Sequence, residues 1–193
     1  MDHCDSLFDD RPIYAIICGA IRNEFELNSI IVRLMSLAAD GFIDGIILST
    51  WKGEFDYNLD YKKRIISLGI TIVESDHVSD SFGSVSFLNY ARQAVQLKAA
   101  IDILPYDCFI LKCRTDLSMD YLNQCLDKLG HIDLSITEKN CFNIDFLYKI
   151  MILNIGISAP FHSMDIVFFG HIIDIKKMIL FESKLYLCKD LPA

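Results

Sequence analysis

The clearest potential for chemistry lies between Cys108 and Asp116, in the run Cys-Phe-Ile-Leu-Lys-Cys-Arg-Thr-Asp. An apolar strand there ends on a cation, a small hydroxyl residue and a carboxylate. In an open α/β sheet, ligands bind beyond the carboxyl ends of the strands. Arg114 can grip a phosphate group directly, and Asp116 can hold a divalent Mg²⁺ or Mn²⁺ that binds a second phosphate. The alternative is that Asp116 caps the helix that follows it.

Two further apolar runs end on residues that suit a binding site. Ser49, Thr50 and Trp51 come at the end of one run, and Gly19 closes the other. An indole at a strand end can stack on a nucleobase or another ring, because aromatic faces bind flat partners. In the alternative interpretation, Trp51 covers the edge of the sheet and Gly19 allows a tight turn.

Arg92 lies in the first turns of a long predicted helix, in the run Leu-Asn-Tyr-Ala-Arg-Gln that also holds Asn89. If that helix packs on the sheet, a charged side chain at this place points toward the strand ends. The planar guanidinium group suits phosphate because it donates two parallel hydrogen bonds. Arg92 and Asn89 are therefore candidate binding residues. The alternative is that Arg92 is a solvated surface residue.

Asp165 stands immediately before four apolar residues, in the run 160–170. A carboxylate at such a place either caps an element or acts as an acid or base held at the start of a rigid strand. His162 and His171 flank it. Each histidine alone is more often structural than a ligand, and the spacing typical of zinc sites is absent from the sequence.

The common nucleotide-binding and hydrolase motifs are missing from the sequence. No G-x-G-x-x-G follows the first apolar run, and neither G-x-x-x-x-G-K-[ST] nor G-x-S-x-G occurs anywhere. These absences argue against a dinucleotide-binding fold of the usual type, a P-loop enzyme and a serine hydrolase.

The hydrophobic pattern predicts alternating strands and helices that bring these groups to one edge of a sheet. Strands are expected at residues 13–18, 45–50, 70–73 and 108–112, and less clearly at 146–155 and 166–169. Helices are expected at residues 24–39, 59–68, 87–104, 119–129 and 172–181. This order is typical of an α/β fold with a mostly parallel central sheet, flanking helices and right-handed crossovers.

The composition indicates a globular protein of one domain. The chain has 193 residues, of which 52% are hydrophobic and 23% are charged, and this length suffices for a real core. We expect residues 1–12 to form an N-terminal tail and residues 13–185 to form the domain. The net charge of −8 argues against nonspecific binding of nucleic acid, which needs a basic surface.

Cysteine usage and hydropathy bear on where the protein resides. Its 7 cysteines show no C-x-x-C spacing, which favours a reduced, intracellular protein. The N-terminus lacks the basic flank and the apolar run of a signal peptide. No window reaches the roughly 18 apolar residues expected of a membrane span. We expect a cytoplasmic protein, and peripheral association with a membrane stays open.

Taken together, these residues resemble the WavE-type lipopolysaccharide synthesis proteins, which are taken to be glycosyltransferases with a GT-A-like (Rossmann-like) fold. The resemblance covers most of the chain from residue 13 to about residue 181. The matching pieces are Ile46–Trp51, Leu88–Gln93, Leu111–Leu117, Pro160–Asp165 and Phe168–Gly170.

This resemblance implies a nucleotide-sugar donor and a saccharide or lipid-linked saccharide acceptor. It implies a role in lipopolysaccharide or capsule biosynthesis, and a peripheral place at the inner face of the plasma membrane stays open. In GT-A-like enzymes, a strand ending in Asp-x-Asp binds the metal and the donor diphosphate. Arg114 stands here in place of the first aspartate, so the position retains the second one, Asp116. Arg92 lies in a turn similar to the Ala-Arg-Asn turn near the donor. Asp165 is the implied base for the acceptor hydroxyl group.

Two alternatives to a glycosyltransferase stay open. The missing first aspartate, and an end of the chain that comes soon after Leu180, are compatible with a catalytically inactive or truncated relative that serves as a binding module. A nucleotidyltransferase, or another sugar-nucleotide enzyme on a related fold, would release pyrophosphate instead of a nucleoside diphosphate.

Overall fold

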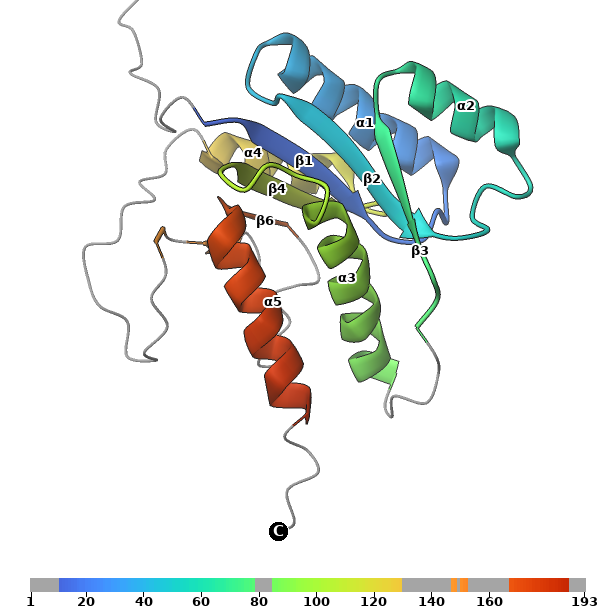
Figure 1. Cartoon of the computed structure of the whole chain (residues 1–193). Coiled ribbons are helices and arrows are strands. Elements are labelled where there is room, and N and C mark those ends of the chain that lie inside the picture. Colours follow the sequence, from blue (N-terminus) through green and yellow to red (C-terminus); the bar gives the residue numbers. More distant parts are fainter. Residues whose placement is uncertain (1–10, 79–84, 130–146, 149, 153–166, 188–193) are drawn as a thin grey trace, which may run out of the picture.

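The protein is built around one six-stranded sheet with the strand order β3-β2-β1-β4-β6-β5 (Figure 1). The computed structural model describes residues 11–78, 85–129, 147–148, 150–152 and 167–187. The strands are β1 (Ile13–Cys18), β2 (Gly45–Trp51), β3 (Thr71–Ser75), β4 (Phe109–Arg114), β5 (Met151–Ile152) and β6 (Phe168–His171). The first four strands run parallel, whereas β6 is antiparallel to both β4 and β5.

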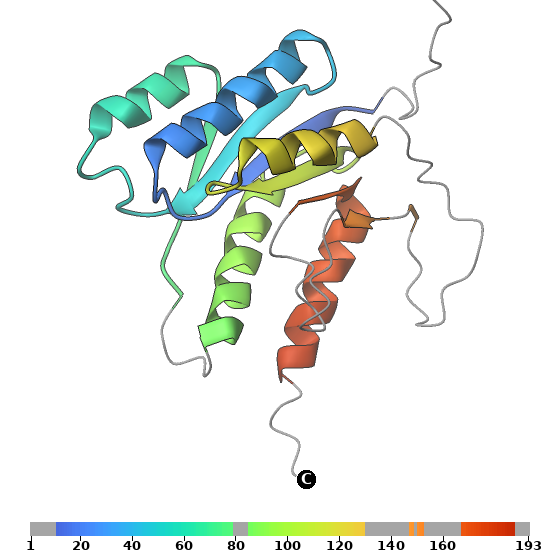
Figure 2. The same ribbon diagram turned by 180° about the vertical axis from the view of Figure 1, so that it is seen from behind.

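Helices cover both faces of the sheet, as the opposite views in Figures 1 and 2 show. One face carries α1 (Glu24–Ala39), α2 (Leu59–Ser67) and α4 (Met119–Leu129). The other face carries α3 (Val85–Ile101) and α5 (Ile172–Leu187). This three-layer arrangement explains why the central strands are apolar on both sides.

Strand β1 illustrates how the sheet divides the core. Its side chains alternate between the two faces because the period of a strand is two. Ala15 and Ile17 pack with α1 and α4, whereas Ile16 and Cys18 pack with α3 and α5. All four are essentially fully buried. Strand β1 is therefore a rigid element, and it ends at the edge of the sheet where the polar groups gather.

Helix caps fix where the first two helices begin. The side-chain oxygen of Asn23 accepts a hydrogen bond of 3.0 Å from the backbone N–H of Phe25, at the start of α1. Asn58 does the same for the N–H of Tyr61 at 3.1 Å, at the start of α2. Such caps satisfy backbone donors that the first helical turn leaves without partners.

The fold class predicted from the sequence is confirmed: a single-domain α/β fold with a mostly parallel, Rossmann-like sheet flanked by helices. Several predicted boundaries differ from the structure. Strand β4 continues through Arg114, so this residue belongs to the strand end instead of the loop. Within residues 146–155, the described residues form a strand at Met151–Ile152 alone. The last helix, expected at 172–181, continues to Leu187.

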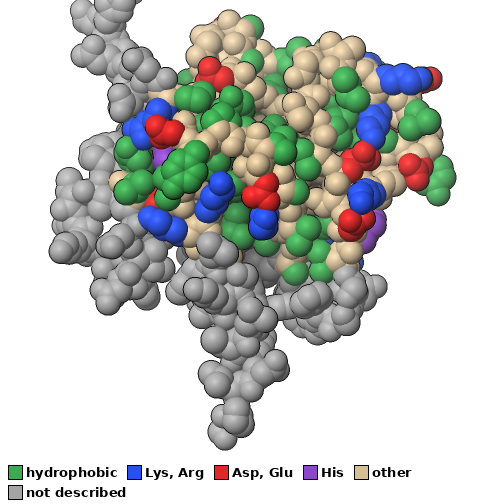
Figure 3. All heavy atoms as spheres, viewed as in Figure 1, with side chains coloured by type: hydrophobic (Ala, Val, Ile, Leu, Met, Phe, Trp, Pro, Cys, Tyr) green, Lys and Arg blue, Asp and Glu red, His purple; other side chains and the backbone are tan. Residues whose placement is uncertain are grey.

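The surface and the helices show two further properties. Acidic and basic side chains are interspersed on the face seen in Figure 3, and do not gather into one basic field. Among the described residues, the helices are too short or too polar to cross a lipid bilayer.

Candidate functional site

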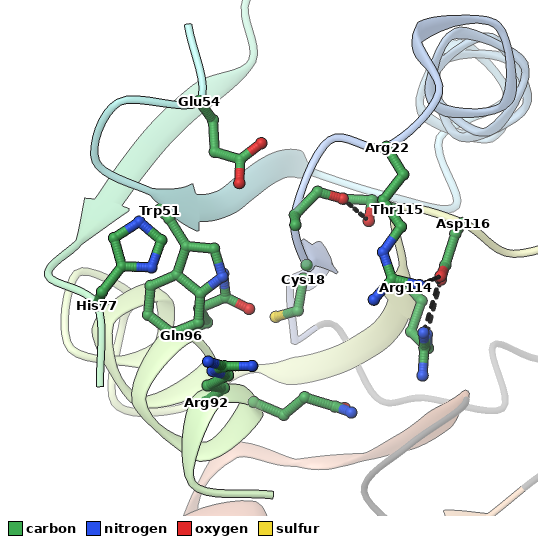
Figure 4. A pocket seen from close by; sticks show the side chains of 13 residues that line it. Cys18, Arg22, Trp51, Glu54, His77, Arg92, Gln96, Arg114, Thr115 and Asp116 are labelled. Carbon is green, nitrogen blue, oxygen red and sulfur yellow. Dashed lines mark hydrogen bonds and ion pairs between the residues drawn. The ribbon is translucent and has the colours of Figure 1, made fainter. Parts of the chain in front are cut away.

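A pocket of about 290 Å³ opens at the edge of the sheet where β1, β2 and β4 end. The last residues of these strands, Cys18, Trp51 and Arg114, all line it (Figure 4). In open α/β sheets, the crevice beyond the carboxyl ends of the strands is the usual ligand site. The pocket therefore lies where the sequence predicts a ligand to bind.

The lining side chains form two groups, which Figure 4 shows at opposite ends of the pocket with the Cys18 thiol between them. The first group, the arginine end, consists of Arg22, Arg114, Thr115 and Asp116. The second group, the aromatic end, consists of Trp51, His77, Arg92 and Gln96.

The arginine end is organised around one carboxylate. Arg114 donates to both oxygens of Asp116, with Nε 2.7 Å from Oδ1 and Nη2 2.8 Å from Oδ2. Arg22 approaches Oδ2 from the other side, with Nη1 at 3.4 Å. A bidentate pair of this kind fixes the plane of the guanidinium group. Asp116 therefore positions two cations at one end of the pocket.

These two arginines also determine how Asp116 titrates. The hydrogen bonds from Arg114 hold the pKa of the Asp116 carboxyl below its ordinary value, and the charges of Arg114 and Arg22 act in the same direction. Partial burial opposes the shift without cancelling it. A carboxylate with a lowered pKa is a weak base. The geometry thus suits Asp116 to holding cations more than to accepting a proton.

The charge of the lining differs in sign from that of the whole protein. Three arginines, Arg22, Arg92 and Arg114, face two carboxylates, Glu54 and Asp116, although the chain carries a net charge of −8. A locally positive cleft in an acidic protein concentrates an anion that the remaining surface repels. The lining therefore favours an anionic ligand.

The aromatic end contains a stacked pair of rings. The ring centroids of Trp51 and His77 lie 5.1 Å apart, and the ring planes make an angle of 22°. Trp51 is only 5% exposed, whereas His77 is exposed. One face of the indole is therefore already covered, and the two rings together form the aromatic surface at this end of the pocket.

The turn after β1 is held in place by threonine hydroxyl groups. Thr50 Oγ1 donates to the carbonyl oxygen of Gly19 at 2.9 Å, and Thr115 Oγ1 donates to that of Ala20 at 2.7 Å. Gly19 has a φ of +143°, and a Cβ atom here would lie 2.5 Å from Thr115 Oγ1. A larger residue would therefore strain the turn and push Thr115 away. Gly19 is required for this close approach.

Three polar residues of the site make contacts inside the protein. Glu54 accepts a hydrogen bond of 2.9 Å from the N–H of Ile21, which ties the loop after β2 to the turn after β1. Ser49 Oγ donates to the backbone oxygen of Gln96 at 2.8 Å. Lys112 is fully buried, and its Nζ lies 3.0 Å from Gln93 Oε1. These contacts join β1, β2, β4 and α3 around the pocket.

The thiol in the middle of the pocket is not an activated nucleophile. Burial raises the pKa of Cys18 to about 12, although the charge of Lys112 acts in the opposite direction. A thiol must ionise to become nucleophilic. Cys18 therefore contributes shape and apolar surface to the pocket.

The described side chains do not fit a protein-made metal site at the arginine end. Among them, no group of three or more histidine, cysteine, aspartate and glutamate residues could hold a metal ion. Both oxygens of Asp116 are already engaged by guanidinium groups. A divalent cation placed there would meet two like charges. The metal expected at Asp116 stays a prediction, and no chemical step below depends on it.

Most of the predicted site residues come together. Gly19, Trp51, Arg92, Arg114 and Asp116 all line the pocket. Ser49 and Thr50 lie at the same edge and are fully buried, but they are not among the lining residues, and their hydroxyl groups bond to the backbone. Asp165, His162 and the side chain of Asn89 lie outside the described residues.

Arg22, Glu54, His77 and Gln96 are among the lining residues that were not predicted as site residues from the sequence. Arg22, Glu54 and His77 lie in loops after β1, β2 and β3, where no pattern marks the direction of a side chain. Gln96 could have been found from the sequence, because it shares the apolar, buried face of α3 with Ala100, one helical turn later. A glutamine on a buried helix face calls for a partner or a ligand.

Comparison with known proteins adds little to this geometry. No protein-family model and no curated protein matches the chain, so the resemblance to WavE-type proteins stays a prediction. One similar solved structure is that of 4-diphosphocytidyl-2C-methyl-D-erythritol synthase from Anaerococcus prevotii DSM 20548, with 13% sequence identity and a TM-score of 0.49. The match covers 95% of this chain and 80% of that one. No inference about function follows from a likeness at this level.

Proposed function

We propose that this protein is a glycosyltransferase that moves a sugar from a nucleotide-sugar donor to a saccharide acceptor. The observation that carries the proposal is the two-ended pocket: guanidinium groups at one end, a stacked aromatic pair at the other, and all of it beyond the carboxyl ends of β1, β2 and β4. A nucleotide-sugar has a matching order of groups, because a flat base and a ribose precede the diphosphate and the sugar.

In the proposed reaction, the diphosphate lies at the arginine end. The bond between the anomeric carbon and the diphosphate oxygen breaks as the acceptor oxygen attacks. Arg114 and Arg22 stabilise the negative charge that develops on the departing diphosphate, as preorganised cations do in other active sites. Asp116 holds both guanidinium groups ready for this role. The proposal thus accounts for a carboxylate that is ionised and fully engaged.

The acceptor hydroxyl group must lose its proton during the attack. We assign this role to Asp165, on the family resemblance alone. The resemblance likewise supports a place for the reaction in lipopolysaccharide or capsule biosynthesis, with membrane-associated acceptors. The proposed catalytic domain spans residues 13–185.

The experiment that tests the function measures binding and turnover of a donor panel by the full chain. UDP-, CMP- and GDP-sugars are titrated by calorimetry, in EDTA and in Mn²⁺, and donor hydrolysis is followed by release of the nucleotide. We expect at least one donor to bind in the micromolar to low millimolar range and to be slowly hydrolysed. If all of these donors fail to bind in both buffers, the proposal is wrong.

A binding module without activity is the second candidate. It is favoured by the engagement of both Asp116 oxygens with arginine, which leaves one carboxylate less for chemistry. The two candidates give different results in the same assay. A donor that binds and is neither transferred nor hydrolysed supports the module. Hydrolysis that disappears in Asp116→Ala supports the enzyme.

A further inference from the structure

The amide of Gln96 carries an unsatisfied hydrogen-bond donor in the wall of the pocket. The residue is only 1% exposed, and its Nε2 atom has no hydrogen-bond partner. A buried donor left in this state destabilises the folded protein, because it has lost its hydrogen bond to water without gaining another. Native proteins rarely tolerate such a group without a reason, and one reason is a partner that is present only in the bound state. Gln96 lines the pocket, and a half-turn of its amide group would present Nε2 to a ligand there, which can supply that partner.

The position of Gln96 is set by the surrounding fold. Its backbone oxygen accepts the hydrogen bond from Ser49 Oγ at 2.8 Å, which fastens this turn of α3 to the end of β2. The next residue, Leu97, is buried in the core between α3 and the sheet. The unsatisfied amide therefore belongs to a fixed part of the wall, as a recognition element requires.

The surroundings of Gln96 indicate which part of a ligand it meets. Gln96 lies at the aromatic end together with the Trp51–His77 pair, and across the pocket from the Arg114–Asp116 pair (Figure 4). If phosphates occupy the arginine end, the group that reaches the aromatic end is the flat end of a nucleotide. A nucleobase carries acceptor atoms on its edge, which the free N–H of an amide can satisfy.

We propose that the side-chain amide of Gln96 recognises a pyrimidine base, by donating a hydrogen bond from Nε2 to a carbonyl oxygen or ring nitrogen of the base. This inference rests on the proposed function, and it names the nucleotide class of the donor. We choose a pyrimidine because it is the smaller of the two base classes and the pocket, at about 290 Å³, lies at the lower limit of the usual range for ligand pockets, roughly 300–1,000 Å³.

The test compares nucleotides with a ligand that has no base, because this comparison distinguishes the contribution of the base to the affinity from that of the phosphates. UDP, CDP, GDP, ADP and pyrophosphate are titrated into the wild-type chain, Gln96→Leu and the control Gln124→Leu. Gln124 is an exposed glutamine of α4 on the other face of the sheet, outside the pocket. Leucine has a volume similar to that of glutamine and lacks its polar atoms.

We expect UDP or CDP to bind more tightly than GDP, ADP and pyrophosphate. Gln96→Leu should weaken the pyrimidine nucleotide by about tenfold, the size of one lost hydrogen bond to a buried group, and should leave pyrophosphate unchanged. Gln124→Leu should match the wild type with every ligand. The unliganded Gln96→Leu protein should melt at the same temperature as the wild type or higher, because it no longer buries an unsatisfied donor.

Three results would overturn the inference. Pyrimidine binding that is unaffected in Gln96→Leu excludes the contact. An equal loss of UDP and pyrophosphate binding shows that Gln96 shapes the pocket and does not recognise the base. A preference for GDP or ADP excludes a pyrimidine. In all three cases nucleotide binding by the wild type survives, and so does the proposed function. A wild type that binds no nucleotide and no nucleotide-sugar contradicts the function itself.

Discussion

The two ends of β4 carry the same kinds of charged residue in opposite surroundings. At its carboxyl end, Arg114 and Asp116 face a pocket. At its amino end, Arg11 approaches Asp107 with Nη1 at 3.6 Å from Oδ1, and His171 Nε2 lies 2.8 Å from the same oxygen.

The difference lies in what covers the arginine. The guanidinium carbon of Arg11 lies 5.1 Å from the ring centroid of Phe109 and 4.7 Å from that of Tyr148. Aromatic rings thus occupy the space that a ligand would need, and cation–π contacts stabilise the cluster. Arg114 shares its end of the sheet with a pocket instead. Residue types alone do not separate a structural cluster from a binding site, whereas packing does.

We call the amino end of β4 the closed end, because the rings of Phe109 and Tyr148 cover Arg11 there, and the carboxyl end at the pocket the open end. The largest effect is expected at the closed end. Asp174 is fully buried, and its carboxylate accepts the backbone N–H groups of Leu147 and Tyr148 at 2.9 and 2.8 Å. Asp174→Ala should lower the free energy of unfolding by about 2–4 kcal/mol, because it removes charged hydrogen bonds and leaves Lys177 without this partner. Urea unfolding followed by circular dichroism measures the change.

The matched control is Asp102→Ala, which removes an exposed carboxylate paired with Lys98 one helical turn earlier. Exposed pairs contribute little, so this variant should stay within about 0.5 kcal/mol of the wild type. Equal losses in the two variants would show that Asp174 does not anchor the segment that carries Tyr148 over Arg11.

The second prediction compares ligand binding at the two ends of β4. Arg114→Ala should weaken pyrophosphate and nucleoside diphosphates by about 10- to 100-fold, the range expected for a lost charged hydrogen bond. Arg11→Ala should destabilise the fold and leave the affinity of the folded protein unchanged. Calorimetric titration gives both affinities, and thermal melting gives the stability.

An arginine far from both ends controls for the loss of one positive charge. Arg64 lies on α2 with its guanidinium carbon 4.9 Å from the ring centroid of Tyr61. Arg64→Ala should keep the wild-type affinity for pyrophosphate. Should Arg11→Ala and Arg114→Ala weaken binding alike, the contrast between the closed and the open end of β4 would be lost.

The sequence predicted the open end better than the closed one, and the reason is physical. An apolar run marks where a strand stops, so Trp51 and Arg114 could be placed at one sheet edge from sequence alone. The contact between Asp107 and His171 depends on the register of β6 against β4, which pairs Phe109 with His171. Such a register follows from packing of the whole sheet and not from local pattern.

Loop residues set the other limit on what the sequence can predict about the site. His77 reaches the pocket from the segment after β3, and Arg22 from the turn after β1. The direction in which a loop side chain points depends on individual backbone angles and on contacts such as the one between Glu54 and Ile21. The composition of the segments carries no such information. Sequence reasoning could therefore find the strand ends of the site and not its loop side.

The third prediction concerns acid. The pKa of Asp116 is lowered in the folded protein, so its ionised form stabilises the fold above the unfolded pKa of about 3.9. That contribution is lost as the pH falls through the lowered folded pKa. Asp116→Asn should therefore flatten the decline in stability as the pH falls below about 4. Urea unfolding at several pH values measures how the free energy of unfolding changes with pH. The control is Asp60→Asn at an exposed position, and it should keep the pH dependence of the wild type.

The smallest effect is expected at Cys18, between the two ends of the pocket. Burial holds its pKa at about 12, so the thiol should resist iodoacetamide at pH 8 in the native protein and react once urea unfolds the chain. Peptide mass spectrometry locates the label. Cys18→Ala should leave the affinity for nucleoside diphosphates within about twofold, because a small apolar residue keeps most of the surface. Rapid native labelling that a nucleotide blocks would instead reveal a thiolate in the pocket, and the pocket would then hold a reactive group as well as a binding surface.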